Sequence, residues 1–433
     1  MNILRSILLF IMTSLLLCLP TAAAVNIEIS APGEQTIPLA ITPLLPIELP
    51  VDGVAETFQQ VLEADLDLSG LFDLIDPEAF LDDAQTLTLR STQVDFAQWR
   101  LLGAEAVIKG GYRMQGEKLA IELRLYDVAS RRLLTGRRYI GKPTDVRRIA
   151  HTFADQVLLG LTKELGPFSS RIAYISNRTG HKELYLMDVD GHNPQRLTDH
   201  RSIVLNPDFA PNRKELIFTS YKAGNPDLYR KEIYTGRESR LSLKQGLNIG
   251  GRYSPDGREV ALTLSKDKNS ELYLIGTDGT IHKRLTNHYS IDVDPTWGPN
   301  GDRIAFVSDR HGNPNIFIID VHSLEVKRLT FEGKYNATPA WSPKGKRIAF
   351  ARLEDREFNI FTINPDGTDE RQLTFGPGSK EHPRWSPDGR FLVYSLDRND
   401  EKSIWVMRAD GTGARRISAE GGDDTHPAWS GHW

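Results

Sequence analysis

Acidic and histidine side chains recur in loops that lead into short strand-like segments of the C-terminal part of the chain. They are Asp292, Asp294, His382, Asp423, Asp424 and His426. Loop carboxylates can bind calcium or act as the paired acids of glycoside hydrolysis, and two histidines can share a metal ion. Solvated loop side chains are the simpler interpretation, because calcium requires roughly six to eight oxygen ligands. The sequence therefore predicts no metal site and no cofactor.

Motifs of several common enzyme classes are missing from the sequence. It has no Gly-x-Ser-x-Gly nucleophile elbow, no GxxxxGK[ST] phosphate loop, no HExxH zinc motif and no EF-hand spacing. The single cysteine, Cys18, lies in an N-terminal apolar run, and we assign no function to His151 or His181. A formal net charge of −4 argues against a nucleic-acid partner, which requires a dense basic surface. These observations favour a binding protein over an enzyme.

The candidate side chains belong to a repeat with a period of 44 residues. Ser-Pro-Asp-Gly-like turns place prolines at Pro211, Pro255, Pro299, Pro343 and Pro387, with Gly431 at the next position. Three further series keep the same spacing. They are the apolar pairs from Leu184-Tyr185 to Ile404-Trp405, the aliphatic residues from Leu197 to Ile417, and the aromatic residues Phe209, Tyr253, Trp297, Trp341, Trp385 and Trp429. Four series in phase indicate a structural repeat.

Each repeat contains four short strand-like runs separated by turn residues, for example residues 339–342, 347–351, 359–364 and 371–375. A unit of roughly 40 to 50 residues with four antiparallel strands is typical of a WD40-like β-propeller blade. Six repeats therefore predict an all-β six-bladed propeller over residues 167–433. The chain finishes on a first strand, whereas the first repeat opens on a second strand near Ile172. We therefore expect the C-terminus to close the ring, and the periodic aromatic residues to pack between blades.

The residues before the repeats predict an α/β domain, a mixed sheet with helices, over residues 25–166. Apolar residues at helical spacing predict helices over 52–66, with Asp52 as N-cap, and over 146–165. A shorter helix and four strands complete the prediction. The helix covers residues 96–102 and the strands cover residues 71–75, 106–114, 119–127 and 133–140.

Residues 1–24 have the layout of a secretory signal peptide. Arg5 precedes an apolar run over residues 7–19, and Pro20 and small residues up to Ala24 follow it. The run is shorter than the roughly 20 residues that a membrane-spanning helix needs. We therefore expect cleavage after Ala24 and a periplasmic protein with no membrane span.

An alternating segment follows the expected cleavage point. Val25, Ile27 and Ile29 alternate with Asn26 and Glu28. This period of two suits a strand that adds to the edge of a partner's sheet. An ordinary edge strand of the first domain explains it equally well.

Several segments outside the periodic turns carry a family resemblance. They are the arm Val25 to Ile29, the run Ala64 to Phe72 with its Leu-x-x-Ser-Gly-x-Phe ending, Gly103 to Gly110, Ala150-His151-Thr152 with Asp155, Arg171 to Tyr174, and Pro427 to Ser430. Together with the Trp-Ser-Pro-Asp-Gly repeats, they resemble the TolB family, periplasmic propeller proteins of the Tol-Pal cell-envelope system. The resemblance covers essentially the whole chain after residue 24.

The resemblance implies a non-enzymatic adaptor, monomeric within a hetero-complex, that supports envelope integrity, outer-membrane constriction during cell division and colicin import. It implies that the channel face of the propeller binds the lipoprotein Pal and that the N-terminal arm binds the inner-membrane protein TolA, with other envelope proteins as further partners. The implied Pal-binding residues are Leu205, Asn206, Leu247, Asn248, Asp292, Val293, Asp294, Asn336, Thr338, Glu381, His382, Thr425 and His426. The implied TolA-binding residues are Val25, Asn26, Ile27, Glu28, Ile29, Ser30, Ala31 and Pro32, within an arm over residues 25–36.

Two other functional classes stay open from the residues alone. A hydrolase or lyase with its site in the channel would require paired carboxylates or a histidine-bound metal. A carbohydrate-binding protein would require exposed aromatic residues outside the repeat positions, for which Tyr289, Tyr335 and Phe358 are the candidates.

Overall fold

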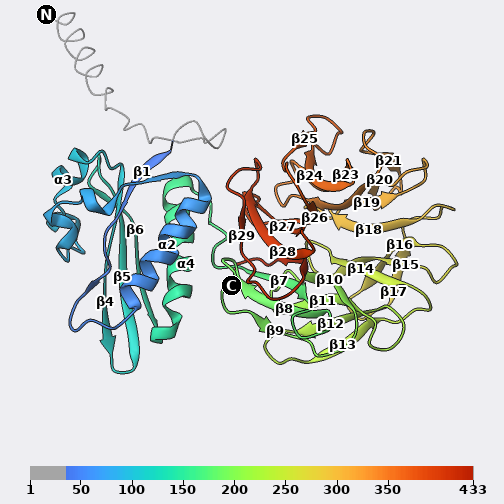
Figure 1. Ribbon diagram of the computed structural model, residues 1–433, viewed down its shortest axis with the longest axis horizontal. Coiled ribbons are helices and arrows are strands. Elements are labelled where there is room, and N and C mark those ends of the chain that lie inside the picture. The colour runs from blue at the N-terminus through green and yellow to red at the C-terminus, as the bar shows by residue number, and fades with distance from the viewer. Residues whose placement is uncertain (1–35, 433) are drawn as a thin grey trace, which may run out of the picture. The chain divides into compact units, whose positions relative to one another are not determined.

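The computed structural model describes residues 36–432 (Figure 1). The N-terminal part contains one mixed sheet of six strands. They are β1 (Ile37–Ile41), β2 (Leu45–Pro46), β3 (Phe72–Leu74), β4 (Ala106–Gln115), β5 (Lys118–Asp127) and β6 (Arg132–Gly141). β1 pairs in parallel with β3 and β4, whereas β4, β5 and β6 form an antiparallel meander. The sequence did not predict β1, because both of its faces are buried and its apolar residues therefore do not alternate with polar ones.

Helices cover both faces of this sheet. They are α2 (Val54–Ser69), α3 (Phe96–Leu101) and α4 (Val146–Thr162), with short 3-10 turns at Pro77–Ala79, Asp82–Gln85, Ser91–Gln93 and Pro143–Asp145. α2 and α4 pack side by side on one face, in a core that includes Leu39 of β1 (Figure 1). Ala40 of the same strand points to the other face, where Trp99 of α3 packs. The mixed sheet with helices confirms the predicted α/β class.

The ends of the helices differ from the sequence prediction at two places. The N-cap of α2 is Gly53 rather than Asp52, with φ of 73° and no side-chain hydrogen bond. A left-handed cap residue suits glycine, which has no Cβ to clash with its own backbone. α4 ends at Thr162, before the predicted residue 165, because Lys163 adopts the left-handed conformation with φ of 65°.

Six four-stranded antiparallel sheets form the C-terminal part. Blade 1 comprises β30 (Asp424–Trp429), β7 (Arg171–Ser176), β8 (Glu183–Asp188) and β9 (Gln195–Arg196). Blade 2 comprises β10 (Val204–Phe209), β11 (Glu215–Ser220), β12 (Asp227–Glu232) and β13 (Glu238–Ser242). Blade 3 comprises β14 (Asn248–Tyr253), β15 (Glu259–Leu264), β16 (Glu271–Gly276) and β17 (Ile281–Arg284). Blade 4 comprises β18 (Asp292–Trp297), β19 (Arg303–Ser308), β20 (Asn315–Asp320) and β21 (Val326–Arg328). Blade 5 comprises β22 (Asn336–Trp341), β23 (Ile348–Glu354), β24 (Glu357–Ile363) and β25 (Arg371–Gln372). Blade 6 comprises β26 (Ser379–Trp385), β27 (Phe391–Arg398), β28 (Glu401–Arg408) and β29 (Arg415–Arg416). The six-bladed propeller is confirmed.

The last strand of the chain closes the ring. β30 pairs antiparallel with β7, so that Asp424 lies opposite Ser176 and Trp429 opposite Ile172. In Figure 1 the red strands of blade 6 lie beside the green strands of blade 1, and β30 contacts both β27 and β28. The prediction that the C-terminus completes the first blade is confirmed.

Neighbouring blades bury apolar layers against one another. One such layer combines Leu272 and Leu274 of blade 3 with Trp297 and Phe306 of blade 4. The Nε1 of Trp297 also donates to the carbonyl of Arg252 in blade 3 at 3.1 Å. The periodic aromatic residues therefore pack between blades, as predicted, and Trp297 adds a hydrogen bond between two of them. No helix within residues 36–432 is long and apolar enough to span a membrane.

Candidate functional site

The first strand of every blade carries the same backbone irregularity at one end of the central channel. These first strands, β30, β10, β14, β18, β22 and β26, contact one another in a closed series around the axis. In each, the pairing register with the second strand shifts next to one residue with positive φ. These six residues, the channel ring, are Asn206, Gly250, Asp294, Thr338, His382 and His426. A bulge re-aims its side chain, so the ring gathers six repeat-related positions at one mouth.

The conformation of the channel ring is strained at five of its six members. The φ angles are 51° at Asn206, 52° at Asp294, 48° at Thr338, 57° at His382 and 49° at His426. A left-handed residue other than glycine costs about 1–2 kcal/mol, and such strain clusters at binding sites. It is most unusual at Thr338, because that side chain is β-branched. The same conformation occurs in ordinary turns, for example at Leu324, so its repetition at one position of every blade is what marks this mouth as the candidate binding site.

The thirteen residues implied for Pal binding separate into three groups. Five of them belong to the channel ring, and five others lie half-buried directly before ring members or in the adjoining loop. These five are Leu205, Leu247, Val293, Glu381 and Thr425. The remaining three, Asn248, Asp292 and Asn336, have no exposed surface.

The buried group holds the loops rather than facing a partner. The amide oxygen of Asn248 accepts from the hydroxyl of Ser242 at 2.7 Å and from the backbone N–H of Lys244 at 2.8 Å. Asp292 accepts two hydrogen bonds from Arg310, at 2.9 and 3.1 Å. Asn336 similarly accepts from Arg352 at 2.9 Å. These buried side chains stabilise the strands and loops that carry the channel ring.

The carboxylates that suggested calcium or glycosidase chemistry are engaged elsewhere. Asp424 is buried and pairs with Arg178 at 2.9 Å, as Asp292 pairs with Arg310 three repeats away. Asp423 accepts from the amide of Asn177 at 2.7 Å. Within residues 36–432, no three His, Cys, Asp or Glu side chains are grouped to hold a metal ion.

The two histidines of the channel ring meet face to face. The rings of His382 and His426, in neighbouring blades 6 and 1, have centroids 3.9 Å apart. Burial lowers the pKa of His382 to about 4, and the positive charges of Arg252, Lys402 and Lys182 act in the same direction. Burial and the facing imidazole also lower the pKa of His426 well below its usual range. Both rings are neutral near pH 7, so the mouth offers hydrogen-bonding groups without cationic charge from histidine.

Asp294, the acidic residue of the channel ring, is a weaker acid than an exposed aspartate. Burial raises the pKa of Asp294, although the charge of Arg252 partly opposes the shift. The sequence interpretation missed Arg252, which lies on β14 two residues beyond Gly250. The signal that could have identified Arg252 is an arginine on the first strand of a blade. The equivalent position of several other repeats holds a small or apolar residue.

A second buried histidine lies outside the channel. His151 of α4 is 3% exposed, and its Nδ1 lies 2.7 Å from a carboxylate oxygen of Asp65 on α2. Its Nε2 lies 3.2 Å from Asp190, in the turn between β8 and β9, and Arg147 also pairs with Asp190. Burial opposes charging of the ring, but the two carboxylates raise the pKa of His151 to about 10. The imidazolium therefore joins α2, α4 and blade 1 as part of an ionic network.

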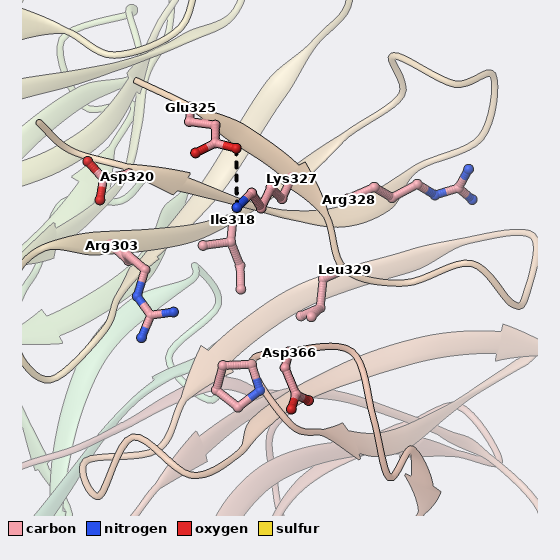
Figure 2. A pocket seen from close by; sticks show the side chains of 9 residues that line it. Arg303, Ile318, Asp320, Glu325, Lys327, Arg328, Leu329 and Asp366 are labelled. Carbon is pink, nitrogen blue, oxygen red and sulfur yellow. Dashed lines mark ion pairs between the residues drawn. The ribbon is translucent and has the colours of Figure 1, made fainter. Parts of the chain in front are cut away.

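A cavity of about 240 Å³ between blades 4 and 5 is another candidate (Figure 2). Figure 2 shows Arg303 pointing toward Asp366 across it, with Glu325 paired to Lys327 above. That ion pair spans 3.2 Å between largely exposed side chains. The lining groups are mixed in charge and include no nucleophile beside a base, so the cavity has no evident chemistry.

Comparisons with known proteins agree with this architecture. The family model described as the TolB beta propeller domain matches residues 159–432, and that of the TolB amino-terminal domain matches residues 25–134. The Tol-Pal system protein TolB of Syntrophotalea carbinolica is 65% identical over 197 residues, which are 45% of this chain and 46% of that protein. The protein of the same name from Geobacter metallireducens is 47% identical over 207 residues, 47% and 48% of the two chains. These alignments span about half the length of each relative.

A solved structure matches over a longer range. The crystal structure of TolB from Acinetobacter baumannii has a TM-score of 0.79 with this chain at 27% sequence identity. The match covers 92% of this chain and 97% of that one. The likeness therefore includes both the mixed sheet and the propeller.

Proposed function

The chain belongs to the TolB family, and from this premise we propose that it is a non-enzymatic, periplasmic binding scaffold of the Tol-Pal system. The scaffold binds Pal through the channel ring and TolA through the arm over residues 25–32. It thereby links the outer membrane and peptidoglycan to the inner-membrane complex, and supports envelope integrity and constriction during division. The arm lies outside the described residues, so its role rests on its alternating sequence.

The observation that carries the Pal proposal is the strained channel ring. Pairing on both sides of each bulge fixes the ring residues before any partner arrives, so little conformational entropy is lost on binding. Thr338 supports this directly, because its hydroxyl is buried without a hydrogen-bond partner among residues 36–432. Rotation of the Thr338 side chain on binding would bring that hydroxyl to the mouth, where a partner's polar group would satisfy it.

The same geometry disfavours a channel enzyme. General acid–base catalysis requires two groups held in opposite protonation states near the substrate. The histidine pair is neutral on both sides, and Asp292 and Asp424 are bound to arginines. A docking surface requires only shape and hydrogen-bonding capacity, which the ring supplies.

Calorimetric titration with the periplasmic domain of the source organism's own Pal tests the proposal. We expect saturable one-to-one binding by the chain that begins at Val25. Thr338→Gly should weaken binding about fivefold to tenfold, the value of one lost hydrogen bond, without lowering the melting temperature, because glycine relieves the strain. Leu324→Gly is the matched control, since Leu324 also has a positive φ, of 62°, in the turn between β20 and β21.

Two results would contradict the proposal. Absence of saturable heat with the unaltered chain would rule out Pal as the partner of this mouth. Equal affinities of Thr338→Gly and the unaltered chain, with Leu324→Gly also unchanged, would move the contact away from the ring.

A further inference from the structure

Two arginines occupy equivalent positions on opposite sides of the propeller channel. Arg252 lies on β14 of blade 3 and Arg384 on β26 of blade 6, three repeats apart in a ring of six. The other blades carry short side chains at this level. They are Asp208, Thr296, Ala340 and Ala428. The two guanidiniums are therefore the long side chains that reach into the channel here.

Neither arginine has a carboxylate partner. Arg252 is only 8% exposed, yet its hydrogen bonds go to the carbonyls of Gly251 at 2.9 Å and Asn206 at 3.5 Å. No carboxylate within residues 36–432 lies at ion-pair distance from it. Buried charges are normally paired, because an unpaired one loses its hydration without compensation. Arg252 is thus a nearly buried cation with unused donors.

Arg384 repeats the arrangement on the opposite side. Its Nη1 donates to the carbonyls of Pro383 at 3.1 Å and Pro339 at 3.4 Å. Its Nε is buried and has no hydrogen-bond partner among the described residues. Two guanidiniums with the same backbone contacts and the same missing partner face one channel.

Space for a partner lies between them. A hollow of about 560 Å³ is lined by both arginines, Asp208 and Thr296, and its rim includes three periodic tryptophans and four turn prolines, which are Trp341, Trp385, Trp429, Pro211, Pro255, Pro343 and Pro387. This volume is typical of small-molecule sites. It opens where the inner strands end, whereas the channel ring lies toward the beginning of the same strands.

The one carboxylate in the hollow leaves Arg252 available. Asp208 accepts from the backbone N–H of Tyr253 at 2.9 Å, which ties blade 2 to blade 3. Burial raises its pKa to about 6, although Arg252 acts in the opposite direction. Asp208 therefore neutralises Arg252 only in part and at a distance.

We propose that this hollow binds an oxyanion, a carboxylate or phosphate group, between the guanidiniums of Arg252 and Arg384. Guanidinium groups present paired N–H donors that match both oxyanions. Thr296 lines the same hollow, and its hydroxyl accepts from the backbone N–H of Trp341 at 3.3 Å and keeps its own proton to donate. The tryptophan and proline rim accepts an apolar body attached to the acidic group. The site is distinct from the proposed Pal contact, because none of its donor side chains belongs to the channel ring, although Arg252 hydrogen-bonds to the carbonyl of ring member Asn206.

Calorimetry and thermal unfolding with two probes test this site. Sodium phosphate and sodium succinate are titrated separately at constant ionic strength, with sodium chloride as the compensating salt. We expect saturable heat with at least one probe below about 10 mM, and a melting temperature that rises with its concentration. A response to phosphate alone or succinate alone supports the site and identifies the preferred oxyanion.

Variants assign the response to the two arginines. Arg252→Gln/Arg384→Gln should bind the probe at least about tenfold more weakly, since charge-assisted hydrogen bonds are lost on both sides. Arg384→Gln alone serves if the double variant does not fold. Arg258→Gln is the matched control, because that side chain is 86% exposed in a turn of blade 3. No saturable response in the unaltered chain, or equal responses in it and the folded arginine variant, would overturn the proposal.

Discussion

Two histidine sites among the described residues differ in charge. His151 is held as an imidazolium between Asp65 and Asp190, with its pKa raised to about 10. His382 faces His426 and stays neutral, with its pKa lowered to about 4. Burial alone favours the neutral ring at both places, so the neighbouring groups decide the outcome.

The charged histidine site stabilises the fold, whereas the neutral site suits recognition of a partner. At His151, carboxylates from a helix and a turn require a cation between them, so the charge contributes to structure. At the channel ring, the neighbours of His382 and His426 are each other and the cations Arg252, Lys402 and Lys182. Neutral rings there remain available for hydrogen bonds with a partner. The comparison yields three predictions, in decreasing order of effect.

Deletion of residues 424–433 should break both histidine sites. His426 lies on β30, and Asp190 belongs to the same blade, because β30 completes the sheet of β7, β8 and β9. We expect loss of the propeller's cooperative unfolding transition, with a stability of about 5–15 kcal/mol at stake. Thermal unfolding by circular dichroism checks this. Removal of only residues 432 and 433, which leaves β30 intact, is the control, and an unchanged transition in the longer deletion would refute ring closure as the stabilising element.

His151→Gln should destabilise the protein far more than His382→Gln. The first change leaves Asp65 and Asp190 buried without their shared cation, which costs about 3–5 kcal/mol. The second replaces a neutral polar side chain by another, so we expect a loss of about 1 kcal/mol or less. Urea unfolding of the two variants measures both. Similar losses would mean that the two histidines do not differ in charge.

The neutral histidine pair should make the protein less stable in acid. The folded-state pKa of His382 lies below the unfolded value of about 6.5, so the unfolded chain binds protons that the folded chain excludes between about pH 6.5 and 4. Stability is unaffected above this window and falls as the pH decreases through it. His382→Gln/His426→Gln should lose at least about 2 kcal/mol less than the unaltered chain between pH 7 and 4.5, because the pKa shift of His382 alone contributes that much.

The difference between the two proteins isolates the histidine pair. Burial raises the pKa of Asp155 to about 7 and that of Asp208 to about 6, so their protonation stabilises the folded state as the pH falls. Both carboxyls are present in both proteins and cancel in the comparison. Parallel pH profiles of stability would show that the pair is not held neutral.

The fold was predictable from the sequence because its signals are periodic or local. The 44-residue spacing determines the blades, and helical spacing with Gly70 locates α2 within a few residues. β1 was missed because burial on both faces removes the alternation that identifies a strand. The N-cap of α2 was assigned to Asp52 because capping side chains are commoner than left-handed glycine caps.

The site was predictable only as a set of loops. The family resemblance implied five of the six ring members, but it also implied Asn248, Asp292 and Asn336, whose side chains are buried. Alternation along a strand cannot reveal which residue a bulge turns toward the channel, because the bulge shifts the register by one position.

The sequence by itself determined the number of blades, the mixed α/β domain before them and the family to which the chain is related. These follow from patterns that repeat or from short segments read in order. Only the tertiary structure decided which histidine is charged, which carboxylates are already paired, and that Arg252 and Arg384 share one hollow. Those properties depend on groups far apart in the chain, whose distances and desolvation arise only when the ring closes.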